Sequence, residues 1–196
     1  MILDLIRHGM SEAGARGQYE GSLDTPLCEA GRQALHPSCD KHNAVYITNK
    51  RRTAETAEIL FPGAARRVIP ALREMNFGAF EGRSWRDMEN DSKYRAWVDG
   101  GCWASCPGGE DRANFSRRVC EAFEALVSEA LAEGRDALVI VAHGGTQMAV
   151  MERWGEPKGE YYSWCTKPGQ GWRLDTADWP ERLRVVERLD FTEAAK

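Results

Sequence analysis

Two short apolar runs in this chain each end in a histidine that is followed by a glycine. The first is residues 2–6, ILDLI, which continues into Arg-His-Gly at 7–9. The second is residues 137–142, ALVIVA, which continues into His-Gly-Gly at 143–145. Short apolar runs are typical of buried β-strands, and glycine lets the backbone turn tightly and approach a ligand closely. The sequence therefore predicts two buried strands that end in turns able to do chemistry.

Helix and strand patterns alternate along the rest of the chain. After a long loop at 9–31, with a helix start near residue 28, apolar spacing predicts helices at 50–60, 111–133 and 146–154. Further strands are expected at 44–48, 67–69, 172–174 and 183–189, the last two as strand pairs at the sheet edge. This alternation predicts an α/β fold, a three-layer sandwich with a mostly parallel central sheet flanked by helices. The tryptophan-rich stretch 76–110 breaks the pattern, and we expect it to be an inserted helical lid.

Length and composition narrow the class of protein. The 196 residues suit a single domain, 1–196, and 42% hydrophobic residues are enough for a packed core. The net charge is −4 and no Lys/Arg block occurs, which argues against nucleic acid or a membrane surface as a partner. No apolar run reaches the roughly 18 residues that span a bilayer, and no signal-peptide pattern is seen. We expect a cytoplasmic protein, with the residues after Asp190 flexible.

The six cysteines form no CxxC pair, so free thiols are expected. The segment 39–42, Cys-Asp-Lys-His, has two kinds of metal-binding side chain, but no second pair of ligands follows it. We therefore expect no metal site.

The polar residues at the two strand ends suit an anionic ligand. In open α/β sheets, ligands bind outside the carboxyl ends of the strands, so His8 and His143 are expected to face one pocket. Arg7 lies at the first strand end, and Arg51 and Arg52 open the helix after the strand at 44–48. Arginine binds phosphate oxygens in a bidentate way, so a phosphomonoester dianion fits this charge.

Five blocks of the sequence resemble the histidine phosphatase (phosphoglycerate mutase-like) superfamily, and they occur in the family's order. The two His-Gly junctions at 7–9 and 143–145 match the family signature. Residues 21–34, GSLDTPLCEAGRQA, are similar to its G-x-x-D-x-P-L-x-x-x-G stretch. Residues 47–57, ITNKRRTAETA, resemble its arginine-bearing helix, and 72–82, LREMNFGAFEG, resemble its L-x-E-x-x-F-G-x-x-E-G segment. Together the blocks span most of the chain.

The resemblance implies a metal-independent, cofactor-free mechanism. His8 would attack phosphorus in line and form a phosphohistidine. Arg7, Arg52 and His143 would stabilise the oxygens of the transferring group. Glu74 would protonate the leaving alkoxide and then activate water. Substrate-binding residues are expected at Arg7, Ser11, Glu20, Gly21, Arg52 and Gly144.

Some positions depart from the family pattern. After the first glycine the family usually has an acid, then Thr, and an Asn a few places on, where this chain has Met10, Ser11 and Gly14. The replacement by Gly14 removes one phosphate donor, which Ser11 would partly supply. Glu20 stands where many relatives have Gln, and an acid there should discourage acidic substrates.

The insertion, from EMNFGAFEGRSWRDM to FSRRV, resembles the bacterial α-ribazole phosphatase branch, which removes the 5′-phosphate of α-ribazole phosphate in cobalamin assembly. Two alternatives stay open within the family, a broad-specificity sugar-phosphate or nucleotide phosphatase and a phosphoglycerate mutase. A non-catalytic phosphate-ligand binding module is the alternative of a different class. The expected partner is a small-molecule phosphate ester, and the sequence leaves the oligomeric state open, with a homodimer as one option.

Overall fold

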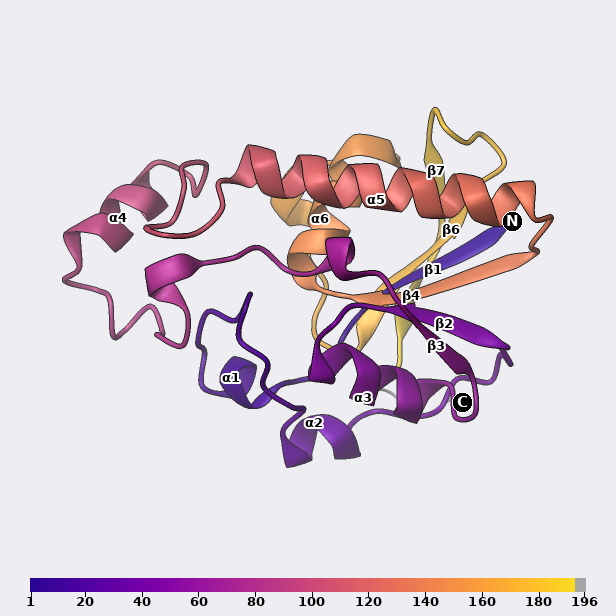
Figure 1. Cartoon of the computed structure of the whole chain (residues 1–196), viewed down its shortest axis with the longest axis horizontal. Coiled ribbons are helices and arrows are strands. Elements are labelled where there is room, and N and C mark those ends of the chain that lie inside the picture. Colours follow the sequence, from indigo (N-terminus) through magenta and orange to yellow (C-terminus); the bar gives the residue numbers. More distant parts are fainter. Residues whose placement is uncertain (193–196) are drawn as a thin grey trace.

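A seven-stranded sheet forms the centre of the computed structural model, which describes residues 1–192. Figure 1 shows this sheet between two layers of helices. The order of the strands across the sheet is β3-β2-β4-β1-β6-β7-β5. The strands are β1 (Ile2–Arg7), β2 (Ala44–Ile47), β3 (Ala65–Val68), β4 (Ala137–Ala142), β5 (Gly155–Glu156), β6 (Gln170–Asp175) and β7 (Leu183–Asp190).

The two strands that carry the histidines are neighbours. β1 and β4 run parallel, with Ile2 opposite Ala137 and Arg7 opposite Ala142. The ladder continues by one bond, because the backbone N–H of His8 donates to the carbonyl of Ala142 at 3.0 Å. The chain therefore leaves both strands at the same level of the sheet, as the two His-Gly junctions predict.

The sheet is mixed, with four parallel and two antiparallel pairings between neighbouring strands. β3, β2, β4 and β1 are parallel, but β6 pairs antiparallel with β1 and with β7. The expected tail strands thus extend the sheet beside its central strand, and the two-residue strand β5, which the sequence did not predict, lies beyond β7 at the edge. Local sequence patterns indicate which residues form strands but not which strands pair. They therefore did not predict that β6, the first strand of the β6–β7 hairpin, pairs with β1.

Helices cover both faces of the sheet, which confirms the α/β class. The helices are α1 (Glu12–Ala15), α2 (Glu29–Gln33), α3 (Arg51–Leu60), α4 (Ser92–Asp99), α5 (Arg112–Ala132) and α6 (Gly144–Trp154), with single 3₁₀ turns η1 (Pro70–Leu72), η2 (Gly78–Phe80) and η3 (Tyr161–Trp164). In Figure 1, α5 and α6 lie on one face and α2 and α3 on the other. Each face has its own core of buried side chains.

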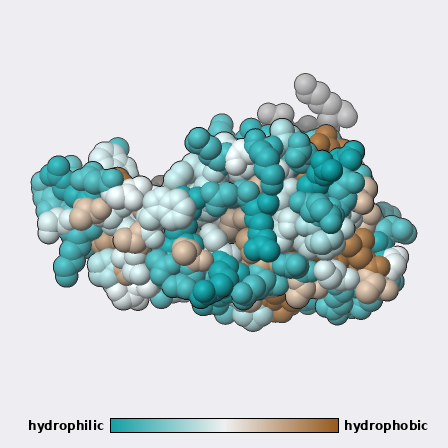
Figure 2. Space-filling view, turned by 90° about the horizontal axis from the view of Figure 1, so that it is seen from above, coloured by the Kyte–Doolittle hydropathy of each residue, from teal (hydrophilic) through white to brown (hydrophobic). Residues whose placement is uncertain are grey.

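The long helix α5 shows how the sequence sets these layers. Asp111 caps it by accepting a hydrogen bond from the backbone N–H of Asn114 at 2.7 Å. The apolar spacing that predicted this helix is reflected in its packing, because Phe115, Val119 and Phe123 are fully buried. The opposite side of the helix is polar, and Figure 2, which looks down on this face, shows a mostly hydrophilic surface.

Residues 76–110 form a projecting lobe at one end of the molecule (Figure 1). As expected, it contains short helical pieces, η2 and α4, rather than sheet. Phe80, Met88, Tyr94 and Trp97 are buried and join the larger core, so the lobe is packed and continuous with the domain.

Other boundaries differ from the sequence prediction by a few residues. β3 begins at Ala65 instead of residue 67 and is exposed along its length as an edge strand. Helix α6 begins at Gly144, directly after the strand-ending histidine, instead of at residue 146. Of the tail, Phe191 is anchored through backbone hydrogen bonds with Gly169 and His36, so flexibility does not begin there; residues 193–196 lie outside the described part.

Candidate active site

The imidazole rings of His8 and His143 face each other at the ends of β1 and β4. Their ring centroids are 5.2 Å apart and the rings meet edge to face. His8 is 8% exposed and His143 is fully buried. The register of the two strands therefore brings the two sequence-predicted histidines together, and only His8 retains access to solvent.

Three buried nitrogen atoms around this pair have no hydrogen-bond partner among residues 1–192. They are Nε of Arg7, Nε of Arg52 and Nδ1 of His143. Buried polar groups normally find a partner, so unpaired donors from three separate elements call for a bound acceptor. Two of these donors are guanidinium N–H groups, and an anion is the acceptor that suits them.

The imidazole of His8 is arranged as a nucleophile. Its Nδ1 lies 2.7 Å from the carbonyl oxygen of Gly9, and it donates its proton to that oxygen, because a carbonyl can only accept. Burial, followed by the positive charges of Arg52 and Arg7, lowers the pKa of His8 well below its ordinary value of 6.5, and the Gly9 carbonyl opposes this shift only in part. His8 is therefore neutral at pH 7, with the lone pair of Nε2 free.

His143 is fixed by Thr48, which follows β2. Its Nε2 lies 2.9 Å from Oγ1 of Thr48. When the hydroxyl donates this bond, Nδ1 carries the ring proton and becomes a donor toward the anion. Burial and the nearby charge of Arg52 lower the pKa of His143 well below 6.5, so this ring is also neutral.

The two arginines are held by backbone carbonyls. Arg7 donates from Nη1 to the carbonyl oxygen of Thr166 at 2.5 Å. Arg52 is fully buried, and its Nη1 and Nη2 donate to the carbonyl oxygens of Leu23 at 2.8 Å and Gly21 at 3.2 Å. Because the two guanidinium groups are already held in place, little free energy is needed to orient them when an anion binds.

Glu74 lies at the N-terminus of α6. Its Oε2 accepts a hydrogen bond from the backbone N–H of Gly145 at 3.0 Å, and its Oε1 accepts one from its neighbour Met75 at 2.9 Å. Burial raises the pKa of Glu74 above its ordinary value of 4.5, while the two N–H groups and the charges of Arg52 and Arg7 act in the opposite direction. The carboxyl group is thus easier to protonate than an exposed glutamate.

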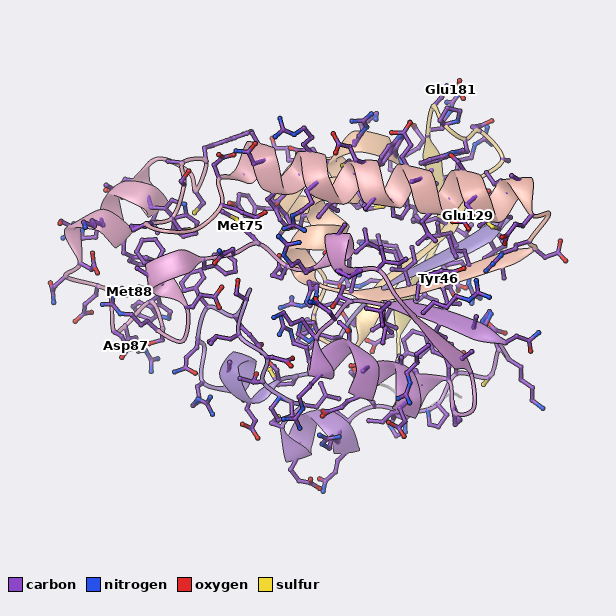
Figure 3. All side chains as sticks on the ribbon, in the orientation of Figure 1. Tyr46, Met75, Asp87, Met88, Glu129 and Glu181 are labelled. Carbon is purple, nitrogen blue, oxygen red and sulfur yellow. The ribbon has the colours of Figure 1, made fainter. Side chains whose placement is uncertain are left out.

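Glu74 forms the boundary between two cavities. One, of about 310 Å³, is polar and contains Arg7 and His8. The other, of about 230 Å³, is lined mainly by apolar and aromatic side chains from α4, α6, η3 and the loops between elements. They are Tyr19, Met75, Phe77, Trp97, Cys102, Met148, Tyr161 and Tyr162, together with Arg112 and Gly145. Figure 3 labels Met75 in the segment that leads from the sheet to the lobe. A ligand with its anionic end beside His8 would place its other end in the apolar cavity, past the carboxyl group.

The family profile of the histidine phosphatase superfamily (branch 1) matches residues 3–171. The chain belongs to the histidine phosphatase superfamily. An adenosylcobalamin/alpha-ribazole phosphatase of Salmonella typhimurium is 32% identical over 163 residues, which are 78% of this chain and 79% of that protein. A glucosyl-3-phosphoglycerate phosphatase of Mycolicibacterium vanbaalenii is 30% identical over 156 residues, 73% of this chain and 69% of the relative.

The fold of this histidine phosphatase is similar to solved structures along its whole length. The alpha-ribazole phosphatase from Shigella flexneri matches with a TM-score of 0.82 and 26% identity, covering 100% of this chain and 99% of that one. The family and enzyme class inferred from the sequence are thereby confirmed. Within residues 1–192, no helix has the length and apolar character needed to cross a membrane.

The remaining predicted binding residues play more varied parts in this histidine phosphatase. Ser11 and Glu20 line the polar cavity. Gly21 contributes a close approach instead, because a Cβ there would lie 1.7 Å from the carbonyl oxygen of Met75 and its N–H donates to Glu81. A Cβ on Gly144 would lie 3.4 Å from the guanidinium carbon of Arg7, an ordinary van der Waals contact, so Gly144 lies beside the arginine but its lack of a side chain is not required there.

Sequence reasoning missed several contributors. Thr48 orients His143, and Thr56 on α3 accepts the backbone N–H of Gly9 at 2.9 Å. Arg112 lines the apolar cavity, with its guanidinium carbon 3.6 Å from the ring centroid of Tyr161. Thr48 directly follows a strand and Thr56 lies on α3, and these positions are only a weak sequence signal for a site residue. Their roles depend on contacts between elements that are distant in the sequence.

A cluster with metal-ligand chemistry lies away from this site. Asp4, Asp40 and His42 bring ligand atoms within 4.8 Å of one another. Arg173 donates to Asp4 at 2.8 Å and to Asp40 at 2.6 Å, so a cation of the protein itself already pairs with both carboxylates. Cys39, the neighbour of Asp40 in the sequence, is not part of the group.

Proposed function

We propose that this protein hydrolyses a small-molecule phosphomonoester through a phosphohistidine at His8. The observation that carries the proposal is the neutral imidazole of His8 beside three buried, unpartnered N–H donors, with the carboxyl group of Glu74 at the exit toward the apolar cavity. Nucleophile, anion site and proton donor are thus arranged around one point where phosphorus can sit.

In the first step, Nε2 of His8 attacks phosphorus and the bond to the ester oxygen breaks. The phosphoryl oxygens lie against Arg7, Arg52 and His143, whose N–H groups are already in place. The leaving oxygen points toward the apolar cavity and takes the proton of Glu74. The products are a phosphohistidine, an alcohol and the carboxylate of Glu74.

In the second step, the carboxylate of Glu74 takes a proton from water as that water attacks phosphorus. The P–N bond breaks, inorganic phosphate leaves and His8 is neutral again. Glu74 ends protonated, so both steps balance without a further reactant. Arginine and imidazole N–H groups supply the charge stabilisation throughout.

The apolar cavity suits an aromatic leaving group. Tyr19, Phe77, Trp97 and Tyr161 line it, and aromatic side chains bind flat rings by offset stacking or edge contacts. We propose α-ribazole 5′-phosphate as the substrate, since relatives similar over most of the chain are named alpha-ribazole phosphatases.

The lobe at 76–110 is proposed to act as a lid over the leaving group. Phe77, Trp97 and Cys102 of the lobe line the apolar cavity. Arg112 joins the lobe to η3, because its guanidinium carbon lies 4.0 Å from the ring centroid of Trp103 and 3.6 Å from that of Tyr161. We also propose a cytoplasmic location, which is supported by six free cysteines.

Phosphate release from a panel of esters tests this function. The panel contains α-ribazole 5′-phosphate, 3-phosphoglycerate, a fructose bisphosphate, a nucleoside monophosphate and p-nitrophenyl phosphate. We expect a preference of about a hundredfold in kcat/KM for α-ribazole 5′-phosphate, which corresponds to roughly 2.7 kcal/mol of transition-state binding. A flat profile would identify a broad-specificity phosphatase, and no release from any ester would favour a binding module.

His8→Ala is the matched control for the panel. It should abolish release from every ester, and the wild-type enzyme, quenched during turnover, should yield a peptide phosphorylated on His8. Wild-type rates in His8→Ala would contradict the mechanism.

A further inference from the structure

A carboxylate lies inside the anion site. The side chain of Glu20 is 6% exposed and lines the polar cavity together with Arg7 and His8. Its Oε1 accepts hydrogen bonds from Oγ1 of Thr25 and from Nη1 of Arg52, the latter at 3.2 Å. Its Oε2 accepts a hydrogen bond from Oγ of Ser11. A negative charge is therefore built into the wall of a site that otherwise attracts anions.

The surroundings of Glu20 fix this charge in place. Ser11 is itself held, because its Oγ also accepts the backbone N–H of Gly14 at 3.0 Å. Arg52 is held by the carbonyl oxygens of Leu23 and Gly21. Three donors on three separate segments thus keep the carboxylate against the cavity, so a bound substrate meets it at a defined position.

A fixed buried carboxylate treats different leaving groups unequally. It repels a second anionic group on the substrate, and the repulsion is strong because few water molecules screen it. A hydroxyl group on the part of the substrate that stays in the polar cavity can instead donate a hydrogen bond to a carboxylate oxygen of Glu20. The phosphate itself is common to all substrates, so its repulsion by Glu20 does not discriminate between them.

We propose that Glu20 is a specificity-determining residue that selects phosphomonoesters of neutral, hydroxyl-bearing alcohols, such as sugars and nucleosides, and rejects esters with a second acidic group. The proposal rests on the phosphatase activity proposed above and adds the substrate class. It explains why the phosphate site contains the carboxylate of Glu20, because this charge disfavours the binding of bisphosphates and phosphorylated acids.

Two substrates that differ at one group test the idea. Glycerol 3-phosphate and 3-phosphoglycerate carry the same phosphate ester, but the first ends in a primary alcohol and the second in a carboxylate. Wild-type enzyme should prefer glycerol 3-phosphate, and Glu20→Gln should reduce the ratio of the two kcat/KM values at least about tenfold. Because both substrates use Arg52 in the same way, any effect of the variant on Arg52 cancels in the ratio.

Glu58→Gln is the control for the change in net charge. Glu58 pairs with Arg66 on the surface, with 70% of its side chain exposed, and this variant should keep the wild-type ratio. Glu20→Ser removes the same charge with a smaller side chain and serves if Glu20→Gln does not fold. An unchanged ratio in the folded Glu20 variant would overturn the proposal.

Binding measurements separate this proposal from the proposed function. In a His8→Ala background, titration calorimetry of the two compounds should show the same shift in relative affinity when Glu20 is replaced. If the wild-type enzyme released no phosphate, the proposed function would fail, yet the calorimetric ratio would still decide the role of Glu20. Equal relative affinities with and without the carboxylate would contradict that role.

Discussion

Gly145 lies so close to Glu74 that a larger residue at position 145 would displace the carboxyl group of Glu74. The N–H of Gly145 donates to Oε2 of Glu74 at 3.0 Å, and a Cβ on Gly145 would lie 2.1 Å from Oε1. The closest conflict is with the end of a flexible side chain, so the carboxyl group would move. The Cβ would also lie 3.0 Å from the Cζ atom of Phe115, so that buried ring would shift by a few tenths of an ångström while the helix stays in place. The position of the proton donor therefore depends on a glycine in the second position of α6.

Gly145→Ala should lower kcat for alkyl phosphates by about a hundredfold, since a misplacement of roughly 1 Å at a reacting group can have that effect. The fold should be retained, because alanine is favoured over glycine in a helix. Kinetics and thermal unfolding of the same preparation check both parts. Gly144→Ala is the neighbouring comparison, and its Cβ would lie at an ordinary 3.4 Å from Arg7, so its effect should be smaller. Equal losses in the two variants would contradict a specific contact with Glu74.

Glu74→Gln should separate the two chemical steps. With p-nitrophenyl phosphate the leaving phenolate needs no proton, so His8 is still phosphorylated, but water is no longer activated. Stopped-flow absorbance should show a burst of about one p-nitrophenolate per active site, followed by turnover slowed by roughly 10²–10⁴. With an alkyl phosphate the burst should be missing because the first step also needs the acid. A full steady-state rate without a burst would assign the base to another residue.

The imidazole rings of His8 and His143 should remain neutral as the pH falls below 6.5. Burial is the largest cause of the lowered pKa of each ring, and the charge of Arg52 adds to it. NMR of the ring nitrogens of His8 and His143, recorded from pH 8 downward, measures this directly. Titration of either buried ring at or above pH 6.5 would show that the arginines and burial do not control it.

The local parts of this structure could be predicted from the sequence. The strand at 137–142 has the predicted boundaries, and the helix predicted at 111–133 differs by one residue at each end. Both elements depend on local features, namely the spacing of apolar residues and, for the helix, a capping aspartate. His8 and His143 meet because both follow buried strands, and strand ends in a parallel pair share one edge.

Contacts between distant segments could not be predicted in this way. The loop at 21–23 is fixed by Glu81, which accepts the backbone N–H groups of Gly21, Ser22 and Leu23, and only this fold brings Glu20 to Arg52. Likewise, β6 and β1 pair although they are about 170 residues apart in the sequence, and hydrophobic periodicity cannot predict such a pairing. Family resemblance identified Arg52 and Glu74, whose sequence surroundings alone would suit ordinary surface positions.

The buried neutral histidines should make stability depend on pH. The unfolded chain takes up a proton at each ring near the ordinary pKa of 6.5, and the folded chain does so only at lower pH. The unfolded state then binds more protons, so the free energy of unfolding falls as the pH drops from 6.5 toward the folded pKa, by at most about 1.4 kcal/mol per pH unit for each ring.

His143→Gln removes one of these rings and should flatten the dependence. Urea unfolding at pH 7.5, 6.0 and 5.0 should show wild type losing more stability than the variant over this range. Glu74 acts in the opposite direction, because its raised pKa makes stability fall as the pH rises above 4.5, but this contribution is common to both proteins and cancels in the difference. His36→Gln, which removes an exposed ring, is the matched control. Parallel curves for wild type and His143→Gln would mean that His143 takes up its proton in the folded protein as readily as in the unfolded chain, contrary to its burial beside Arg52.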